Sequence, residues 1–468
     1  MGGRGGKRAR EQAPGLHGVG SGVLTALGIA LLRTMRFALR WLAAFAITMG
    51  GLEIGFRLDP ALIPEDLLQR FDRGLRIEIA SRRYLPNESQ TWNLERDDGG
   101  PPLKLFQPFS RVAFHFADTG QDGVMVMDAQ GFCNAPSDDY APAKIDLIAL
   151  GDSFTMCFPT DPTLTWPSVL GRLLGRPIYS LARGGYGPYE YVQILKRFGL
   201  AKKPDVVVMQ LYEGNDLRDA VRYHEYADAS PEEKARFPER AGWQLIGVNH
   251  FPFLENWVGR HSYAYNTLVT ALALGVSAAK QLTDDLLFDG PSHRVDFRYT
   301  LKFPDGAVAM NVGNHDKDEV RTARDLRAGV IRLDAFDGAL ATFAMLARSH
   351  GFRPVVSYVP SAYTAYAEFV EFEDPALHEL MPWFHAAQRD YLTAKARDLG
   401  FEFLDLTPAM HARARELRGK ELLYYPINVH CTPAGHRLTA ETVAARLRQE
   451  VSALGGTPAP VAADGSQP

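Results

Sequence analysis

The sequence predicts an α/β protein, a three-layer α/β/α sandwich around a parallel sheet of about five strands. Strand-like runs at residues 145–150, 177–180, 205–211, 354–359 and 401–406, most of them largely apolar, alternate with stretches that are patterned for helices. Uninterrupted apolar runs are typical of parallel strands, because helices cover both of their faces. The chain has 468 residues, of which 46% are hydrophobic and 23% charged, so it has ample material for such a core and for an insertion.

The N-terminal part of the chain is first basic and then apolar. Residues 1–36 are rich in arginine and are predicted to be a disordered basic segment, and the run 41–52 carries no charge. A bilayer span needs about 20 residues. The predicted membrane anchor or signal helix is therefore extended to residues 37–56, with Arg40 and Glu53 near its ends, where long side chains reach the interface. A cleaved signal peptide and a buried helix are the alternatives.

The basic flank also predicts where the rest of the chain lies. Arginine and lysine beside a membrane helix stay in the cytoplasm, so everything after the helix is predicted to be exported. The expected location is the inner (cytoplasmic) membrane, with a single span and with the folded domain in the periplasm or outside the cell.

Four further segments complete the predicted organisation. Residues 57–140 are expected to form a stalk and a β-hairpin, with strands at 111–116 and 123–127 around a glycine-containing turn. The strand–helix rhythm then continues to residue 452, apart from an insertion at about 220–325. The end of the chain is rich in proline, alanine and glycine and is predicted to be disordered. The predicted boundaries are 1–36, 37–56, 57–140, 141–452 and 453–468.

Three of the predicted strands end in turns of small and polar residues. Open α/β sheets gather such turns at the carboxyl ends of their strands, where they bind ligands. A serine at that edge is a nucleophile if a base reaches it and if hydrogen-bond donors await an oxyanion. Taken singly, each residue also has a structural explanation as a helix cap or an ordinary turn. The turns are Gly151-Asp152-Ser153, Gly184-Gly185 and Gly214-Asn215-Asp216, and His430 lies just before the last predicted helix.

Together these blocks supply serine, glycine, asparagine and histidine in that order. Over about residues 145–450 the chain resembles the SGNH, or GDSL-type, hydrolase superfamily, and in particular membrane-anchored bacterial members that act on envelope polysaccharides. The resemblance implies a flavodoxin-like parallel sheet. It also implies that Ser153 is the nucleophile and His430 the general base. The backbone N–H groups of Ser153 and Gly185 and the side-chain amide of Asn215 would form the oxyanion hole.

The segment before His430 departs from the pattern of the superfamily. Members with this kind of ending usually carry an acid two or three residues before the histidine, where this chain has Asn428 and Ile427. Asn428 is therefore the candidate for the third catalytic position. An asparagine can hold an imidazole through its carbonyl oxygen, but it cannot stabilise the imidazolium with a full charge. Asp405 is a possible substitute that nothing in the sequence places near His430.

Composition and cysteine positions exclude several functions. The formal net charge of −4 gives no support for nucleic-acid binding. Motifs for a metal site or a phosphate loop are missing, so no metal and no cofactor are expected. Cys133 and Cys157 flank the nucleophile strand, and in an exported domain they would form a disulfide, although free thiols are equally compatible with the sequence.

The expected function is that of a serine esterase or O-acyltransferase that acts through an acyl-enzyme on Ser153. By analogy with anchored members of the superfamily, the substrate would be an acyl ester, in particular an acetyl ester, of an envelope polysaccharide, and a membrane protein would be the acyl donor if the enzyme is a transferase. The alternative from another class is a degenerate member that binds glycan or serves as a scaffold. A lipase is a third option, because the apolar stretch 263–282 would line a lipid cleft if it were not core. Hydrolysis and transfer are not distinguished by the sequence.

Overall fold

A computed structural model describes residues 19–63, 91–116, 121–135, 144–231, 258–272, 297–311 and 318–453, together with residues 67, 71, 75, 78, 79, 118, 119, 234 and 275. The chain divides into two compact units, Met1–Leu75 with Ala241–Val276, and Arg76–Arg240 with Ser277–Pro468. Residues 1–18, most of the predicted stalk and the tail after residue 453 lie outside the described residues, as does much of the predicted insertion.

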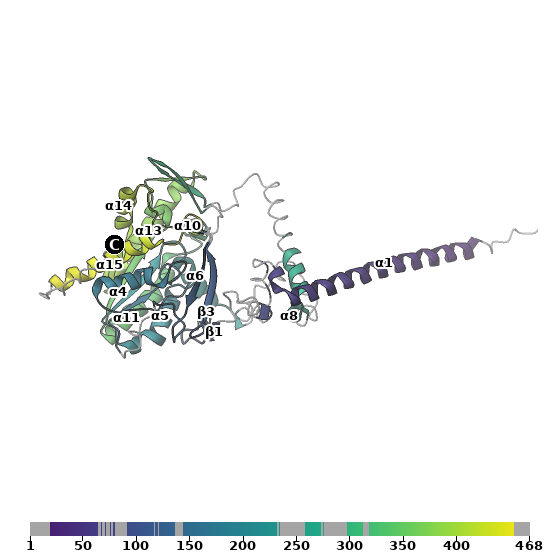
Figure 1. Cartoon of the computed structure of the whole chain (residues 1–468), viewed down its shortest axis with the longest axis horizontal. Coiled ribbons are helices and arrows are strands. Elements are labelled where there is room, and N and C mark those ends of the chain that lie inside the picture. Colours follow the sequence, from purple (N-terminus) through teal and green to yellow (C-terminus); the bar gives the residue numbers. More distant parts are fainter. Residues whose placement is uncertain are drawn as a thin grey trace, which may run out of the picture. The chain divides into compact units, whose positions relative to one another are not determined.

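The first unit is built on one long helix, α1 (Val19–Leu58), drawn in purple in Figure 1. Its part from Leu32 to Leu58 has a mean hydropathy of 1.4 and no fully buried residue, so it is long and apolar enough to cross a membrane. The predicted anchor 37–56 lies inside α1. The helix also includes residues 19–36, which were expected to be disordered, because the run after Val19 is rich in alanine and leucine, which favour helix.

The end of α1 packs against part of the predicted insertion. The short helix α8 (Gly259–His261) and the helical residues 263–272 belong to the same unit as α1. The Glu53 carboxylate accepts hydrogen bonds from Ser262 Oγ at 2.8 Å and from the Ala264 N–H at 2.9 Å. The Arg57 guanidinium lies 4.6 Å from the centroid of the Tyr263 ring. The charged side chains of Glu53 and Arg57 near the end of α1 thus contact other residues of this unit.

The second unit contains a five-stranded parallel sheet with the strand order β12-β10-β7-β5-β6. In chain order this is 5-4-3-1-2, the doubly wound order of flavodoxin-like folds, so the predicted fold class is confirmed. The first strand lies in the interior of the sheet, between the second and the third, and every residue of this strand is buried. The strands are β5 (Leu147–Leu150), β6 (Ile178–Ser180), β7 (Val206–Tyr212), β10 (Arg353–Val359) and β12 (Glu402–Asp405).

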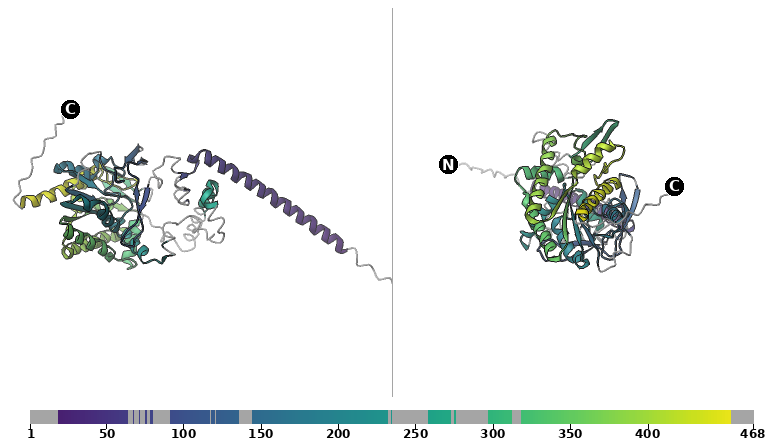
Figure 2. Two further views of the ribbon diagram at one scale, coloured as in Figure 1. Left: turned by 90° about the horizontal axis from the view of Figure 1, so that it is seen from below. Right: turned by 90° about the vertical axis from the view of Figure 1, so that its left-hand side faces the viewer.

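Helices cover both faces of this sheet, as the turned views in Figure 2 show. Alternate residues of β5 face opposite layers, because successive side chains of a strand point to opposite sides. Leu147 and Ala149 pack in one core cluster with Trp166, whereas Ile148 and Leu150 pack in another. The first cluster lies under α4 (Trp166–Leu174) and α15 (Pro433–Ala453), and the second under α5 (Pro188–Ile194), α11 (Asp337–His350) and α13 (Leu377–Leu399).

Smaller sheets surround the main one. The predicted β-hairpin is confirmed, since β3 (Arg111–Phe116) pairs antiparallel with β4 (Gln121–Val126). A second pair is formed by β1 (Thr91–Leu94) and β2 (Leu103–Phe106). A third small sheet has the order β11-β8-β9 and is formed by β8 (Tyr299–Phe303), β9 (Gly306–Met310) and β11 (Val370–Phe372). Further helices are α6 (Asp216–Ala227), α10 (Asp318–Arg327), α12 (Ala362–Ala365) and α14 (Thr407–Leu417).

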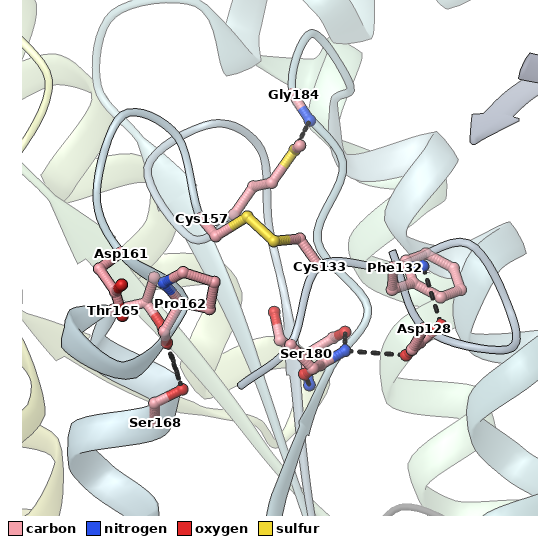
Figure 3. Close-up of a disulfide and its surroundings, with 12 residues drawn as sticks. Asp128, Phe132, Cys133, Cys157, Asp161, Pro162, Thr165, Ser168, Ser180 and Gly184 are labelled. Carbon is pink, nitrogen blue, oxygen red and sulfur yellow. Dashed lines mark hydrogen bonds between the residues drawn. A yellow bond between two sulfur atoms is a disulfide. The ribbon is translucent and has the colours of Figure 1, made fainter. Parts of the chain in front are cut away.

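A disulfide joins the segment after β4 to the loop after β5. Cys133 and Cys157 are bonded, with their Cα atoms 5.9 Å apart (Figure 3). Of the two states that the sequence allowed, the structure therefore has the disulfide. Cys431 is a free, buried thiol.

Candidate active site

Ser153 lies in a sharp turn at the carboxyl end of β5. The Asp152 carboxylate accepts a hydrogen bond from the Phe154 N–H at 2.8 Å, and its carbonyl accepts from the N–H groups of Thr155 and Met156. Such a turn, closed by an aspartate side chain, folds the chain back on itself. A Cβ atom at Gly151 would lie 2.1 Å from Thr155 Oγ1, so only glycine fits before the turn. This turn and its hydrogen bonds hold Ser153 at the edge of the sheet.

His430 contacts this serine directly. Its Nε2 atom lies 2.8 Å from Ser153 Oγ, and its Nδ1 atom lies 3.0 Å from the carbonyl oxygen of Asn428. A carbonyl only accepts hydrogen bonds, so in the neutral imidazole Nδ1 carries the proton and Nε2 is free to accept the serine proton. The ring stacks on Phe154 at 4.7 Å and meets the edge of Phe158 at 5.6 Å, which fixes its plane.

The protonation state of His430 follows from these surroundings. Burial lowers the pKa of His430 to about 4, because the charged imidazolium loses its hydration, while the hydrogen bond to the Asn428 carbonyl opposes this effect. At neutral pH the imidazole is therefore uncharged and able to take up a proton.

Asn428 supports His430 in a way that the sequence did not indicate. The oxygen at Nδ1 belongs to the main chain of Asn428, and the side-chain Oδ1 instead accepts from the His430 N–H at 3.1 Å. Between them, Val429 has a φ of +51°, in the left-handed region. The turn is held from outside by the Asp118 carboxylate, which accepts hydrogen bonds from the N–H groups of Ile427 and Asn428.

Asp405, the possible substitute for an acid, and the nearby His436 have partners other than His430. Asp405, at the end of β12, accepts a hydrogen bond from the Thr407 N–H at 2.9 Å, which caps the first turn of α14. His436 is buried in α15, where its Nδ1 accepts from the Trp166 N–H at 3.3 Å. Burial lowers the pKa of His436 to about 3, so its imidazole is neutral and structural.

The glycine loop after β6 lies against Ser153. The Arg183 N–H donates to the Gly151 carbonyl at 3.0 Å, which ties this loop to the turn that carries Ser153. A Cβ atom at Gly184 would come within 3.4 Å of Ser153 Cβ. Gly185 has a φ of +76°, which glycine adopts without strain. Its position after the second strand, beside Ser153 after the first, is the one expected from the sequence.

Asn215 follows β7 and begins α6. Its side-chain Nδ2 donates to Asp219 Oδ2 at 3.1 Å, one turn further along the helix. The Arg222 guanidinium also contacts Asp219, at 2.8 Å. Asp219 therefore fixes the orientation of the asparagine amide, a contact that the spacing of four residues on a helix explains but that the sequence analysis missed.

Buried carboxyl groups surround this part of the site. Burial raises the pKa of Asp152 to about 7, although the hydrogen bond from the Phe154 N–H opposes the shift. Burial raises the pKa of Asp219 to about 7 as well, against the charge of Arg222. Burial and the neighbouring Asp152 charge raise the pKa of Asp216 well above its usual value, and Asp216 accepts hydrogen bonds from Tyr191 Oη and the Tyr212 N–H. These aspartates accept hydrogen bonds from residues in or beside the turns after β5 and β7.

A pocket of about 430 Å³ opens at Ser153 and His430. The glycine loop forms part of its lining, and β1, β2, β3 and β4 form another part, so the small sheets that precede the main sheet in the chain help to shape the site. The lining residues are Thr91, Lys104, Phe106, Val112, Met125, Ser153, Met156, Phe158, Arg183, Gly184, Gly185 and His430. Within the part of the chain that the structure describes, no group of three or more His, Cys, Asp or Glu could hold a metal ion.

Comparison with known proteins gives similarities only among solved structures. No family model matches the chain, and no curated protein matches it significantly. A protein described as lipolytic, of the G-D-S-L family, from Desulfitobacterium hafniense DCB-2 shares 14% identity, with a TM-score of 0.31 and with 64% of this chain and 99% of the other covered.

Two further solved structures are esterases by name. An acetyl xylan esterase shares 11% identity with a TM-score of 0.33, over 65% of this chain and 100% of the other. A variant of an acetyl-xylooligosaccharide esterase from Geobacillus shares 12% identity with a TM-score of 0.30, over 64% of this chain and 92% of the other. Likenesses of this size say nothing about the activity or the substrate of this chain.

Proposed function

We propose that this protein, whose sheet order and order of site residues are those of an SGNH-type hydrolase, is a serine esterase or O-acyltransferase. The observation that carries the proposal is the contact of 2.8 Å between Ser153 Oγ and His430 Nε2, with Nδ1 held by a carbonyl so that Nε2 is the accepting atom. A hydroxyl beside a neutral, oriented imidazole is the arrangement that activates a serine for attack on an acyl group.

The reaction begins with attack by Ser153 on the ester carbonyl carbon. His430 Nε2 takes the proton of the hydroxyl, and the electron pair of the carbonyl bond moves onto its oxygen. The N–H groups of Ser153 and Gly185 and the amide of Asn215 are the donors proposed for that oxyanion, and the loss of one such donor typically costs about 10²–10³ in rate.

Collapse of this intermediate breaks the ester bond. The alcohol leaves with the proton from His430, and the acyl group stays on Ser153 Oγ. A water molecule or a sugar hydroxyl then gives its proton to His430 and attacks the acyl carbon, and Ser153 recovers its proton as it leaves. Water as the acceptor makes the protein an esterase, and a sugar hydroxyl makes it a transferase.

We propose that the protein is exported and anchored by α1. The apolar length of α1 and the basic residues before it support a single span with the N-terminus in the cytoplasm. The Cys133–Cys157 disulfide supports an oxidising compartment for the domain, since such bonds persist mainly outside the cytoplasm. An anchored enzyme outside the cytoplasm favours an acetylated envelope polysaccharide as the substrate and, for a transferase, a membrane protein as the acyl donor.

Labelling with a fluorophosphonate tests the nucleophile. The full chain in detergent is incubated with the probe, and intact mass reports the addition at Ser153 with loss of fluoride. We expect stoichiometric labelling, none in Ser153→Ala, and labelling slower by about 10²–10⁴ in His430→Ala. Ser349→Ala, which changes an exposed serine of α11, is the matched control and should label normally. A folded wild-type protein that does not label would overturn the proposal.

A second candidate function, that of a non-catalytic glycan-binding or scaffold protein, is favoured by one observation. A main-chain carbonyl contacts His430 Nδ1 in place of a carboxylate, so the imidazolium formed during catalysis is stabilised by a dipole instead of a full charge. Under this alternative the full chain binds acetylated glycan and does not react with the probe.

A further inference from the structure

Arg183 is a cation in the wall of the pocket, two residues before Gly185. Its guanidinium carbon lies 4.0 Å from the centroid of the Phe106 ring. Its Nε atom donates to the Lys104 carbonyl at 3.3 Å and its Nη1 atom to the Gly184 carbonyl at 3.1 Å. These contacts hold the group in a single orientation, and both hydrogen-bond acceptors are uncharged.

The charge of Arg183 is not balanced by a carboxylate among the residues that the structure describes, which distinguishes it from other arginines of this unit. Arg96 forms ion pairs with Asp98 and Glu190, and Arg218 forms one with Asp325. Burial alone would lower the pKa of Arg96, but these carboxylates raise it, whereas burial lowers the pKa of Arg183. A half-buried guanidinium without an anion gives up hydration and gains little in return.

The pocket lining around Arg183 also lacks negatively charged side chains. The lining of the pocket includes two cationic side chains, Lys104 and Arg183, and no carboxylate. Apart from the catalytic pair, the glycines and Thr91, the other lining side chains are apolar, so a charge placed there is weakly screened. An anion that enters the pocket therefore meets an oriented guanidinium close to the nucleophile.

We propose that the pocket takes the ester of an acidic glycan, and that Arg183 binds its anionic group, as a specificity-determining residue. The inference rests on the proposed esterase or transferase function. An acetyl group carries no charge, so the anion must lie on the sugar. Carboxylate, sulfate and phosphate share the required chemistry, and a planar guanidinium binds each of them through paired N–H donors.

Binding to the Ser153→Ala protein tests the proposal independently of catalysis, because nothing is turned over. Titration calorimetry on the full chain in detergent compares 3-O-acetylglucuronic acid with 3-O-acetylglucose, which differ in a single carboxylate. The 6-sulfate and 6-phosphate of 3-O-acetylglucose distinguish the possible anions. We expect at least one anionic ligand to bind about 10- to 100-fold more tightly than the neutral sugar.

Variants at position 183 assign the preference. In the Ser153→Ala background, Arg183→Gln should bind anionic and neutral sugars equally, and Arg183→Lys should keep part of the preference. Arg332→Gln, which removes an exposed arginine that pairs with Asp334, is the matched control and should bind as the parent does. A cooperative urea unfolding transition of Arg183→Gln shows that this variant is folded, so that a lost anion preference reports binding.

The outcomes separate the two proposals. Equal affinity for anionic and neutral sugars, or an anion preference that survives in Arg183→Gln, would overturn the role of Arg183 even if Ser153 reacts. A failure of wild-type Ser153 to react, together with an anion preference that requires Arg183, would overturn the catalytic proposal and leave an acidic-glycan binding site.

Discussion

The residue that most affects the proposed chemistry is Asn428, because it stands where an acid is expected. It holds His430 Nδ1 through its main-chain carbonyl, and its side chain bonds to the His430 N–H instead. We therefore predict that Asn428→Asp changes the rate of Ser153 labelling by less than about tenfold, since a carboxylate would accept the same main-chain hydrogen bond. Asn428→Ala should slow labelling by about fivefold through a looser turn. An increase of 10² or more in Asn428→Asp would contradict this account, because it would require the side chain to reach Nδ1.

The pH dependence of the reaction is a second prediction at the scale of residues. Because burial lowers the pKa of His430 to about 4, the imidazole takes up its proton only well below the pH at which an exposed histidine would. The acid limb of kcat/KM, or of the labelling rate, should therefore have its midpoint near pH 4 instead of near pH 6.5. Rates measured from about pH 3 to about pH 8 test this, and a midpoint between about pH 6 and pH 7 would contradict it.

At this scale the sequence predicted which residues lie at the candidate site but only some of the contacts that hold them. Ser153, Gly185 and Asn215 follow adjacent strands of the sheet, so their meeting at one edge was predictable from the strand–turn rhythm. The hydrogen bond between the Asn428 main-chain carbonyl and His430 was not predictable, because the residue type does not determine the direction of its carbonyl group. Asp118 was missed as well, since it lies 309 residues before Ile427 and no local pattern connects them.

At the scale of elements, the disulfide fixes the loop that carries Ser153. It joins Cys157, four residues after Ser153, to Cys133, and the neighbouring Met156 sulfur accepts from the Gly184 N–H at 3.3 Å (Figure 3). Closing a loop over a separation of 24 residues contributes about 3 kcal/mol to the free energy of unfolding.

We predict that the double variant Cys133→Ser, Cys157→Ser loses about this amount, measured by urea unfolding of the full chain in detergent. The wild-type protein treated with a reductant should shift to the same midpoint. The double variant, which has no bond to break, should not respond to the reductant and serves as the control. Equal midpoints for oxidised wild type and variant would show that the bond does not stabilise the domain.

Elements also differ in how well the sequence predicts them. The strand β7 (Val206–Tyr212) was predictable because burial on both faces leaves a run that is apolar apart from Gln210. The pairing of β8 (Tyr299–Phe303) with β11 (Val370–Phe372) was not, because a strand of three residues has too few positions to show a period. The hairpin β3–β4 was predicted, but its contribution to the pocket wall depends on tertiary packing.

At the scale of the whole molecule, the chain divides into a unit built on an apolar helix and a unit built on the five-stranded parallel sheet. The contacts of Glu53 and Arg57 with Ser262, Tyr263 and Ala264 show that part of the predicted insertion belongs with α1. The sequence located the apolar helix but could not assign this partner, since about two hundred residues separate the two segments. The same contacts mean that removing α1 would also expose the segment it covers, so the anchor is better tested by substitution than by truncation.

We predict that the full chain stays with membranes after extraction at alkaline pH and that Phe45→Arg, Ile47→Arg moves it to the soluble fraction. Both side chains are exposed in the middle of α1, where each arginine costs about 2.5–3.5 kcal/mol for insertion. Met345→Arg is the matched control, because Met345 is an exposed apolar residue of α11, and it should sediment as the wild type does. A tag placed before α1 should remain on the mature protein, since an anchor is retained and a signal peptide is cleaved. Sedimentation of the double arginine variant like the wild type would mean that other parts of the chain hold it at the membrane.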